Sequence, residues 1–353
     1  MERWRFCAVL ISIFSSGCAH QGYLWQAFRG QMAIFNRQVP IDEVIQNPSM
    51  PRKTKEKLQL VKEIKKFAEI EMGVKPTTNY SKYVDLKRPH VVWVVSVADQ
   101  FELNQKTWSF PLVGEVPYLG YFKEKGALDF AKDMEEEGYD VSVGGVDAYS
   151  SLGYFQDPLL STMIDSSDGS IANLIFHETT HRYIYVSGDG HFNESAASFI
   201  GELGEKVYLE NKYGKDSNAI KSWEDTKQRR RKYAKSVKEF ADSLKVFYSQ
   251  LKFKNLSKEK MDSAKYERFR NFQESAVDEN EKRFRSQFKN NASLLSYLNY
   301  EDNQEFFDLI AEKSKGHVRH ALECLKRYVE QNQHLRGNLM GEKGRASLPA
   351  HCD

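Results

Sequence analysis

The sequence predicts an α+β fold. A mixed sheet with accompanying helices is expected in the middle third, and a mostly helical region toward the C-terminus. Two observations support this prediction. Strand-like runs cluster between residues 90 and 147, and from about residue 194 onward the apolar side chains recur at helical spacing among many charges. Because no repeat period is visible, we do not expect a solenoid.

Composition narrows the class of protein. The chain has 353 residues, of which 41% are hydrophobic and 28% charged, as expected of a globular protein. Its 51 basic and 49 acidic residues nearly cancel, which argues against a nucleic-acid-binding protein. No run of eighteen apolar residues exists, so a polytopic membrane protein is excluded. Four cysteines without a Cys-x-x-Cys pair argue against a disulfide scaffold and a thiolate zinc site.

The N-terminus has the layout of a bacterial secretory signal. Two arginines precede a short apolar stretch at 6–14, and three small residues then lead to Cys18. A cysteine at this place resembles the acylation site of a lipoprotein, although Ser15 stands where leucine is usual. We expect residues 1–17 to be a signal peptide and Cys18 to carry a lipid anchor in the cell envelope, on the periplasmic side. Plain secretion and an uncleaved anchor are the alternatives.

Helices are expected near this anchor, in residues 18–75. Within them, 53–72 has apolar residues at helical spacing and is followed by Gly73 and Pro76, which end a helix. Trp25 and Phe28 could contact the membrane or pack on the body.

The middle of the chain, residues 76–205, is expected to hold the sheet. A helix over 123–137 separates the third and fourth strand-like runs, which are 90–98, 108–113, 116–122 and 140–147. Pro111 and Pro117 cannot donate to a sheet, so their strands should be edge strands or interrupted ones.

A metal-binding pattern follows the last strand. His177-Glu178-Thr179-Thr180-His181 has the zincin spacing His-Glu-x-x-His, which on a helix places both imidazoles on one face. Glu178 would lie close enough to hold a water bound to the metal. Ser167 or Asp168 can cap this helix, and the glycines after it can end it.

A catalytic zinc site needs a third protein ligand, and the turn after this helix offers three candidates. Asn193 is a suitable N-cap for a second helix, and Glu194 in its first turn would face the two histidines. Asp189 and His191 compete for the same role, but we favour Glu194 as the third ligand of a single Zn²⁺.

These segments resemble a known family. Residues 107–122, 143–163 and 174–197 are similar to the predicted bacterial aminopeptidase family of envelope zinc metallopeptidases, in the gluzincin division of the zincins. The resemblance implies a zincin-like core, a lipoprotein, metal ligands at His177, His181 and Glu194, and a catalytic Glu178. The family's cysteine pair is replaced by Ser109 and Glu115, and its arginine by Leu119.

If the chain is a peptidase, further residues should contact its peptide substrate. Tyr149, Tyr154 and His191 are candidates for stabilising the transition state. Substrate backbone should add to the strand near 143–149, and an aminopeptidase also needs an acid for the substrate amine. The acids that could serve are Asp147, Asp157 and Glu102.

Residues 206–353 form the expected helical C-terminal region. Phe240, Leu244 and Leu251 should be helix core, and the basic run 227–232 a solvated face. Cys324 and Cys352 could pair in an oxidising compartment. The sequence favours an envelope-anchored zinc peptidase, and the alternative is a non-catalytic envelope protein with a structural metal site. It does not indicate the oligomeric state.

Overall fold

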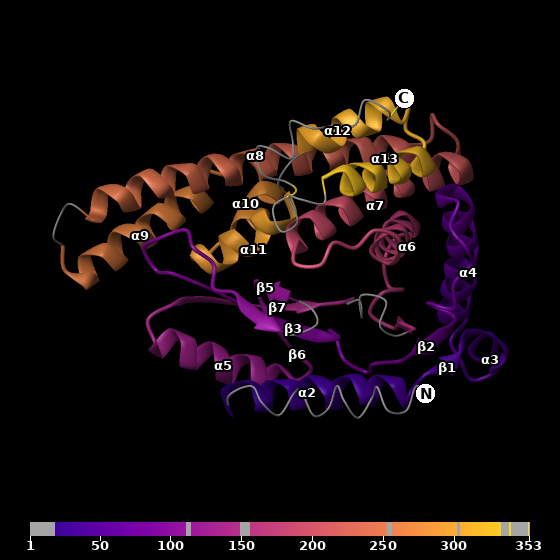
Figure 1. Cartoon of the computed structure of the whole chain (residues 1–353), viewed down its shortest axis with the longest axis horizontal. Coiled ribbons are helices and arrows are strands. Elements are labelled where there is room, and N and C mark those ends of the chain that lie inside the picture. The colour runs from indigo at the N-terminus through magenta and orange to yellow at the C-terminus, as the bar shows by residue number, and fades with distance from the viewer. Residues whose placement is uncertain are drawn as a thin grey trace.

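The computed structural model describes residues 18–110, 114–148, 156–252, 256–301 and 304–332, together with 339 and 352. The expected signal peptide, Tyr149 and Tyr154 lie outside this part of the chain. The described residues form a mostly helical α+β structure with small sheets, as the sequence predicts (Figure 1). No described helix has the length and apolar character needed to cross a bilayer.

The larger sheet is antiparallel and has the order β6-β3-β7. Its long pair joins β3 (Val92–Ala98) and β7 (Asp140–Val146), which align along their whole length. Helix α5 (Glu124–Glu136) packs on this sheet and on β6 (Leu119–Tyr121). Trp93, Val95 and Leu119 therefore become part of a small apolar core between sheet and helix.

The strand-like run over 116–122 is interrupted at Pro117, one of the two outcomes expected for it. Val116 ends β5 (Gly114–Val116), which pairs with β4 (Trp108–Phe110), whereas β6 follows the proline and pairs with β3. Proline has no N–H for a ladder, so the chain changes sheets there.

A second sheet lies nearer the N-terminus and has the order β1-β2-β8. Strand β2 (Lys82–Val84) pairs antiparallel with β1 (Val39–Pro40) and parallel with β8 (Leu159–Leu160). Short helix α3 (Ile41–Gln46) follows β1 directly. The pairing of β2 with β8 joins the segment before β3 to the segment that leads into α6 (Asp168–Tyr183).

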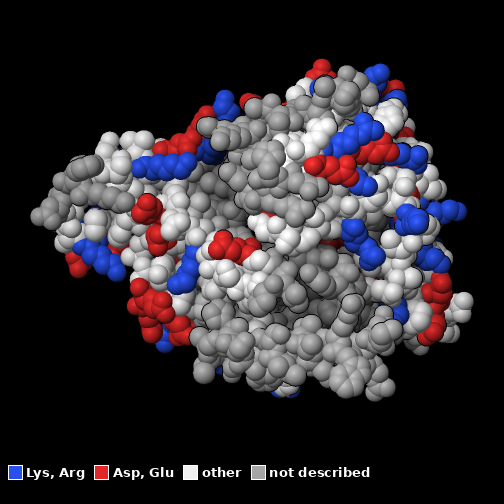
Figure 2. Space-filling view, viewed as in Figure 1, with Lys and Arg blue, Asp and Glu red and all other residues white. Residues whose placement is uncertain are grey.

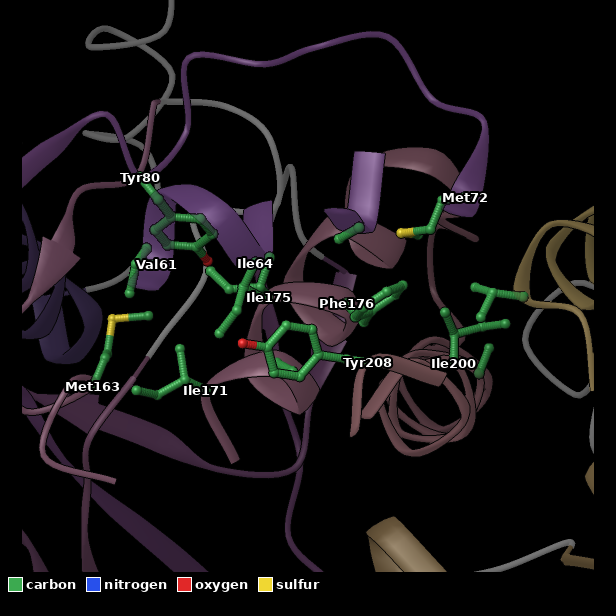
Figure 3. Close-up of a cluster of buried hydrophobic side chains, with 14 of the residues drawn as sticks. Val61, Ile64, Met72, Tyr80, Met163, Ile171, Ile175, Phe176, Ile200 and Tyr208 are labelled. Atoms are coloured by element: carbon green, nitrogen blue, oxygen red, sulfur yellow. The ribbon is translucent and has the colours of Figure 1, made fainter. Parts of the chain in front are cut away.

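Several of the described helices line the main core. The predicted helix 53–72 is confirmed as α4 (Arg52–Met72), which ends at Gly73 with a left-handed φ of 66°. It packs against α6 (Asp168–Tyr183), and α7 (Gly190–Tyr213) packs on α6 in turn. Figure 3 shows their apolar side chains meeting, among them Ile64, Ile175 and Phe176. Helix α2 (Cys18–Phe35) lies along the lower edge of the molecule in Figure 1.

The C-terminal part is helical, as expected. Helices α8 (Asn218–Lys252), α9 (Lys258–Glu274), α10 (Glu279–Arg285) and α11 (Asn291–Glu301) enclose an aromatic cluster. Phe240, Leu244 and Leu251 are buried in it, as predicted. Helices α12 (Gln304–Lys313) and α13 (Val318–Gln331) contribute instead to the main core beside α4 and α7.

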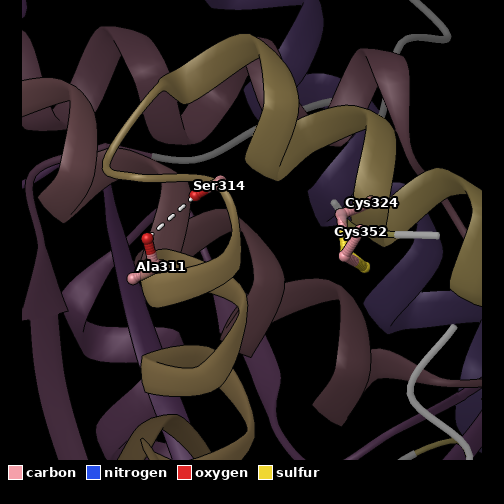
Figure 4. Close-up of a disulfide and its surroundings, with 4 residues drawn as sticks. All are labelled: Ala311, Ser314, Cys324 and Cys352. Atoms are coloured by element: carbon pink, nitrogen blue, oxygen red, sulfur yellow. Dashed lines mark hydrogen bonds between the residues drawn. A yellow bond between two sulfur atoms is a disulfide. The ribbon is translucent and has the colours of Figure 1, made fainter. Parts of the chain in front are cut away.

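Cys324 of α13 and Cys352 form a disulfide with a Cα–Cα separation of 5.2 Å (Figure 4). The sequence left this pairing open because 28 residues separate the two thiols. Both cysteines are buried, so the bond fastens the chain end to the main core. On the face seen in Figure 2, acidic and basic side chains intermix across the described surface.

Candidate metal centre

Helix α6 carries the two histidines on one face. It begins where the Ser167 hydroxyl accepts a hydrogen bond from the Ser170 N–H at 3.1 Å, one of the two caps that the sequence offered. His177 and His181 follow one turn apart, with their rings nearly perpendicular and their Nε2 atoms 3.1 Å apart. His181 is 3% exposed and His177 is partly exposed, so the pair opens toward one side only.

Helix α7 supplies the third side chain. Glu194 Oε2 lies 3.6 Å from His177 Nε2, and its Oε1 lies 3.6 Å from His181 Nε2. A donor atom from each of the three residues lies within 4.8 Å of the other two. The expected convergence of His177, His181 and Glu194 is therefore present in the structure.

Two glycines of α7 let the helices approach closely. A Cβ on Gly204 would lie 2.2 Å from a ring carbon of Phe176, and one on Gly201 would lie 2.9 Å from the Asn173 side chain. Gly201 comes two turns after Glu194 and shares its face of the helix. These glycines were not singled out from the sequence, although the seven-residue step from Glu194 was the signal that could have indicated them.

The turn between the helices differs from the expected one. Asn193 does not cap α7, which begins three residues earlier, after an Asp189 carboxylate that accepts from the Phe192 N–H. The Asn193 amide is instead buried and pairs with both backbone groups of Val186, at 2.8 Å each. These two hydrogen bonds hold the turn immediately before Glu194 in place. Asp189 was missed as a cap because Asn193 offered equally good capping chemistry.

The distances in this cluster fit a small divalent ion. Tetrahedral zinc with ligand bonds of 2.0–2.2 Å places neighbouring ligand atoms about 3.3 Å apart. The three separations of 3.1, 3.6 and 3.6 Å bracket that value. Two imidazoles and one carboxylate are also a donor set that proteins use for catalytic zinc. The residues present could thus hold a metal without rearranging the helices.

The protonation states expected for the cluster also suit a bound metal ion. Burial lowers the pKa of His181 to about 4, so its imidazole is neutral at pH 7. Burial would raise the pKa of Glu194, but the two histidines outweigh it and hold that pKa below its usual value. His177 is the exception, because Glu194 and Glu178 outweigh burial and raise its pKa. A bound cation would replace the proton that these carboxylates favour on His177.

Glu178 follows His177 on α6 and is 7% exposed. Its carboxylate acts electrostatically on His177 and also on Tyr80, whose pKa is raised well above its usual value first by burial and then by Glu178. Tyr80 has a left-handed φ of 56°, rare for an aromatic residue, and its N–H donates to the Asp157 carbonyl at 2.9 Å. No feature of the sequence indicated that this loop would reach the helix of Glu178.

The remaining predicted residues take different places. Asp189 is buried, caps α7 and also accepts from the Leu339 N–H, so it does not join the metal cluster. His191 is partly exposed and is not among the three clustered residues. Asp147 pairs with His90 at 2.9 Å near the end of β7. Cys18 is the first residue of α2.

The profile of a family described as "Putative aminopeptidase" matches residues 22–340. The chain belongs to this family. No curated protein and no solved structure matches the chain. The match covers the sheet, the metal-binding cluster and most of the C-terminal helices, so membership concerns nearly the whole chain and supports peptidase function in general.

Proposed function

We propose that this protein is a zinc-dependent aminopeptidase of the bacterial cell envelope, with a zincin-like core. The observation that carries the proposal is the convergence of His177, His181 and Glu194, with Glu178 beside them on the same helix. A structural metal site has no need of a buried carboxylate next to its ligands. Family membership independently supports peptide hydrolysis.

Zinc is the metal proposed for this donor set. Two imidazole nitrogens and one carboxylate oxygen suit zinc better than magnesium or calcium, which prefer oxygen ligands alone. His177, His181 and Glu194 would hold the ion and leave a position open to water. Bound there, zinc supplies Lewis-acid chemistry by lowering the pKa of a water and polarising a carbonyl.

Glu178 is proposed as the general base. Its carboxylate would take the proton of the attacking water and then deliver that proton to the nitrogen of the leaving amine. Burial suits both tasks, because a shielded carboxylate exchanges protons with the substrate and not with bulk water. Tyr80 and the loop around it would limit the movement of this side chain.

Substrate is proposed to bind along β7. Among the described strands β7 pairs with β3 alone. Asn290 donates to the Val141 carbonyl and so covers the start of the outer edge, but the edge from Val143 onward can accept a peptide as an added strand. Gly144 and Gly145 lie in this strand and present little side-chain bulk. Asp147, Asp157 and Glu102 remain candidates for the acid that pairs with the substrate amine. The candidates for the donor to the oxyanion are Tyr149, Tyr154 and His191.

The test compares wild type with Glu178→Gln on a library of unblocked peptides. We expect the variant to keep zinc and to lose activity about 10²–10⁴-fold, the typical contribution of a general base. Glu202→Gln is the matched control, since Glu202 of α7 pairs with Lys227 of α8 and is not one of the three clustered residues. N-acetylated peptides should resist cleavage by wild type if the enzyme needs a free amine. Absence of zinc-dependent cleavage by wild type would favour a non-catalytic envelope protein.

Location is proposed to be the envelope, through a lipid on Cys18 and with the body on the periplasmic side. The arrangement of residues 1–18 supports this. Metabolic labelling with a fatty acid should mark the wild-type chain and leave Cys18→Ala unlabelled. Equal labelling of both chains would contradict the assignment.

A further inference from the structure

Helix α2 has one face fixed on the body. The Gln26 side chain pairs with two backbone groups along the outer edge of the β6 segment, donating to the Gly120 carbonyl at 2.9 Å and accepting from the Phe122 N–H at 3.2 Å. Tyr23 accepts a hydrogen bond from the Gly120 N–H, and Ile34 is buried in the main core. These contacts fix which face of α2 packs on the body.

The opposite face of α2 is exposed and apolar. Trp25 is 60% exposed, Phe28 48% and Met32 37%, and they recur at steps of three and four residues. Each position lies roughly half a turn from the face that carries Tyr23 and Gln26. Trp25 and Phe28 stack on each other with ring centroids 5.9 Å apart. We call Trp25, Phe28 and Met32 the α2 stripe.

Helix α2 itself carries positive charge only. No acidic residue occurs between Glu2 and Asp42, whereas Arg29 is an exposed residue next to Phe28 in the helix. A tryptophan and a phenylalanine next to arginine, on a helix without carboxylates, suit the headgroup region of an anionic bilayer. Elsewhere the described surface mixes both signs, as Figure 2 shows for one face.

The chain before α2 places this helix at a membrane. Residues 6–14 are an apolar run preceded by two arginines, and α2 starts four residues later, at Cys18. If this run stays in the bilayer, or if it is removed and a lipid on Cys18 replaces it, α2 begins at the membrane surface. A helix that starts there and exposes an apolar face has the bilayer as its nearest partner.

We infer that the α2 stripe is a membrane-docking surface, which lies in the headgroup region of an anionic bilayer and orients the protein on it. This goes beyond a lipid anchor, which attaches a protein without fixing its orientation. The inference rests on the proposed envelope location, through either kind of anchor, and not on peptidase activity. Helix α2 runs along one edge of the molecule, and α8, α12 and α13 lie toward the opposite edge (Figure 1). Docking through the α2 stripe holds these C-terminal helices away from the membrane.

The test uses the full chain in isolated bacterial membranes. Single cysteines replace Trp25, Phe28 or Met32, and matched controls replace Tyr266 and Val277, which are 67% and 73% exposed. Labelling by a membrane-impermeant maleimide is measured before and after detergent, against the parental chain as background. We expect stripe positions to label at least about tenfold more slowly in membranes than in detergent. The control positions should label equally in both.

A second measurement separates lipid from other covers. A fluorophore on the same cysteines is read in vesicles of phosphatidylethanolamine and phosphatidylglycerol that contain spin-labelled lipid. Quenching at Phe28→Cys but not at Val277→Cys supports the inference. Protection without quenching would overturn it, because residues 1–17 or a second protein copy would then cover the α2 stripe. Rapid labelling in membranes would overturn it as well. Thermal melting of the solubilised variants reports whether each one folds.

Discussion

Two helix pairs in this protein pack by opposite means. Between α6 and α7 the contact is made by Gly201 and Gly204, which leave room for Phe176 and Asn173 against bare backbone. Between α8 and α9 it is made by large rings, and Phe240 stacks on Phe272 with centroids 4.1 Å apart. Glycines allow two helix axes to come close, whereas phenylalanines hold them apart and bury more apolar area.

The difference follows the polar groups that each pair contains. The α6–α7 pair encloses His181, Glu178 and Asn193, all nearly buried. The glycines at this contact bring Glu194 within 3.6 Å of both imidazoles, but they contribute little buried apolar area themselves. The aromatic pair borders a polar cluster of another kind, a buried ion pair in which Lys265 of α9 donates to Asp140 of β7 at 2.6 Å. We infer that the α6–α7 contact serves mainly to position Glu194 against the two histidines, whereas the α8–α9 contact serves mainly to stabilise the fold.

Removing a ligand from the first pair should have the largest effect. Glu194→Ala leaves the metal two imidazoles only, and zinc affinity is expected to fall at least about 100-fold, more than loss of a residue that merely orients a ligand. Competition with a chromogenic chelator measures this. Glu202→Ala, eight residues further along α7, should bind zinc like wild type. Unchanged affinity in Glu194→Ala would show that the metal, if any, binds elsewhere.

Truncating a ring in the second pair should reverse the pattern. Phe240→Ala removes a ring that contacts both Phe269 and Phe272, and the free energy of unfolding should fall by about 3 kcal/mol. Zinc affinity should not change, because the aromatic cluster lies outside the metal-binding pair. Urea unfolding and a zinc titration on the same sample test both parts. A large loss of zinc affinity would mean that the two pairs are coupled.

Filling the glycine contact should affect both properties together. Alanine normally gains about 1 kcal/mol over glycine inside a helix. In Gly204→Ala, however, the new methyl group meets Phe176 at 2.2 Å, and overpacking of this kind costs about 1–3 kcal/mol. We expect a net loss of about 1 kcal/mol in the free energy of unfolding, with weaker zinc binding as α7 moves outward. Gly190→Ala is the control, since no atom lies within 4 Å of its Cβ.

The sequence was sufficient for features that depend on local spacing. His177 and His181 share a face because four residues make about one helical turn, and α4 ends at Gly73 because glycine tolerates a positive φ. Proposing Glu194 as their partner needed a guess about the turn between the helices, and that guess placed the start of α7 four residues too late. Asp189 and Asn193 are both capping residues, and only the packed turn decides between them.

Features that depend on distant parts of the chain were not predictable. The left-handed Tyr80 is held by the carbonyl of Asp157, 77 residues further along, and reaches Glu178 through the fold alone. Pro117 indicated that its strand would be interrupted, but not that β5 and β6 would enter different sheets. The spacing of residues indicates which side chains share a face of one helix or strand, but it does not indicate which helices and strands contact each other.

The smallest expected effect concerns pH and the outer end of the α6–α7 pair. Asp168 begins α6 and accepts from Lys212 of α7 at 2.8 Å and from Lys57 of α4 at 3.3 Å. Burial would raise its pKa, but Lys212, Tyr213 and Lys57 outweigh burial and lower it. An acid with a depressed pKa in the folded state stabilises the fold above its unfolded pKa of about 4, and this contribution disappears as pH falls through the folded pKa.

Asp168→Asn should therefore lower the free energy of unfolding by about 0.5–1 kcal/mol at pH 7, a modest value because the carboxylate is partly exposed. The difference from wild type should shrink as pH falls below the unfolded pKa of about 4, and it should vanish only below the depressed pKa of the folded state. Urea midpoints at pH 7, 5 and 3 measure it. Asp165→Asn, which breaks only a surface pair with Lys53, should show little difference at any pH. A gap of the same size at pH 7 and pH 3 would mean that Asp168 acts by shape and not by charge, and that this end of the α6–α7 pair is held by packing, as α8 and α9 are.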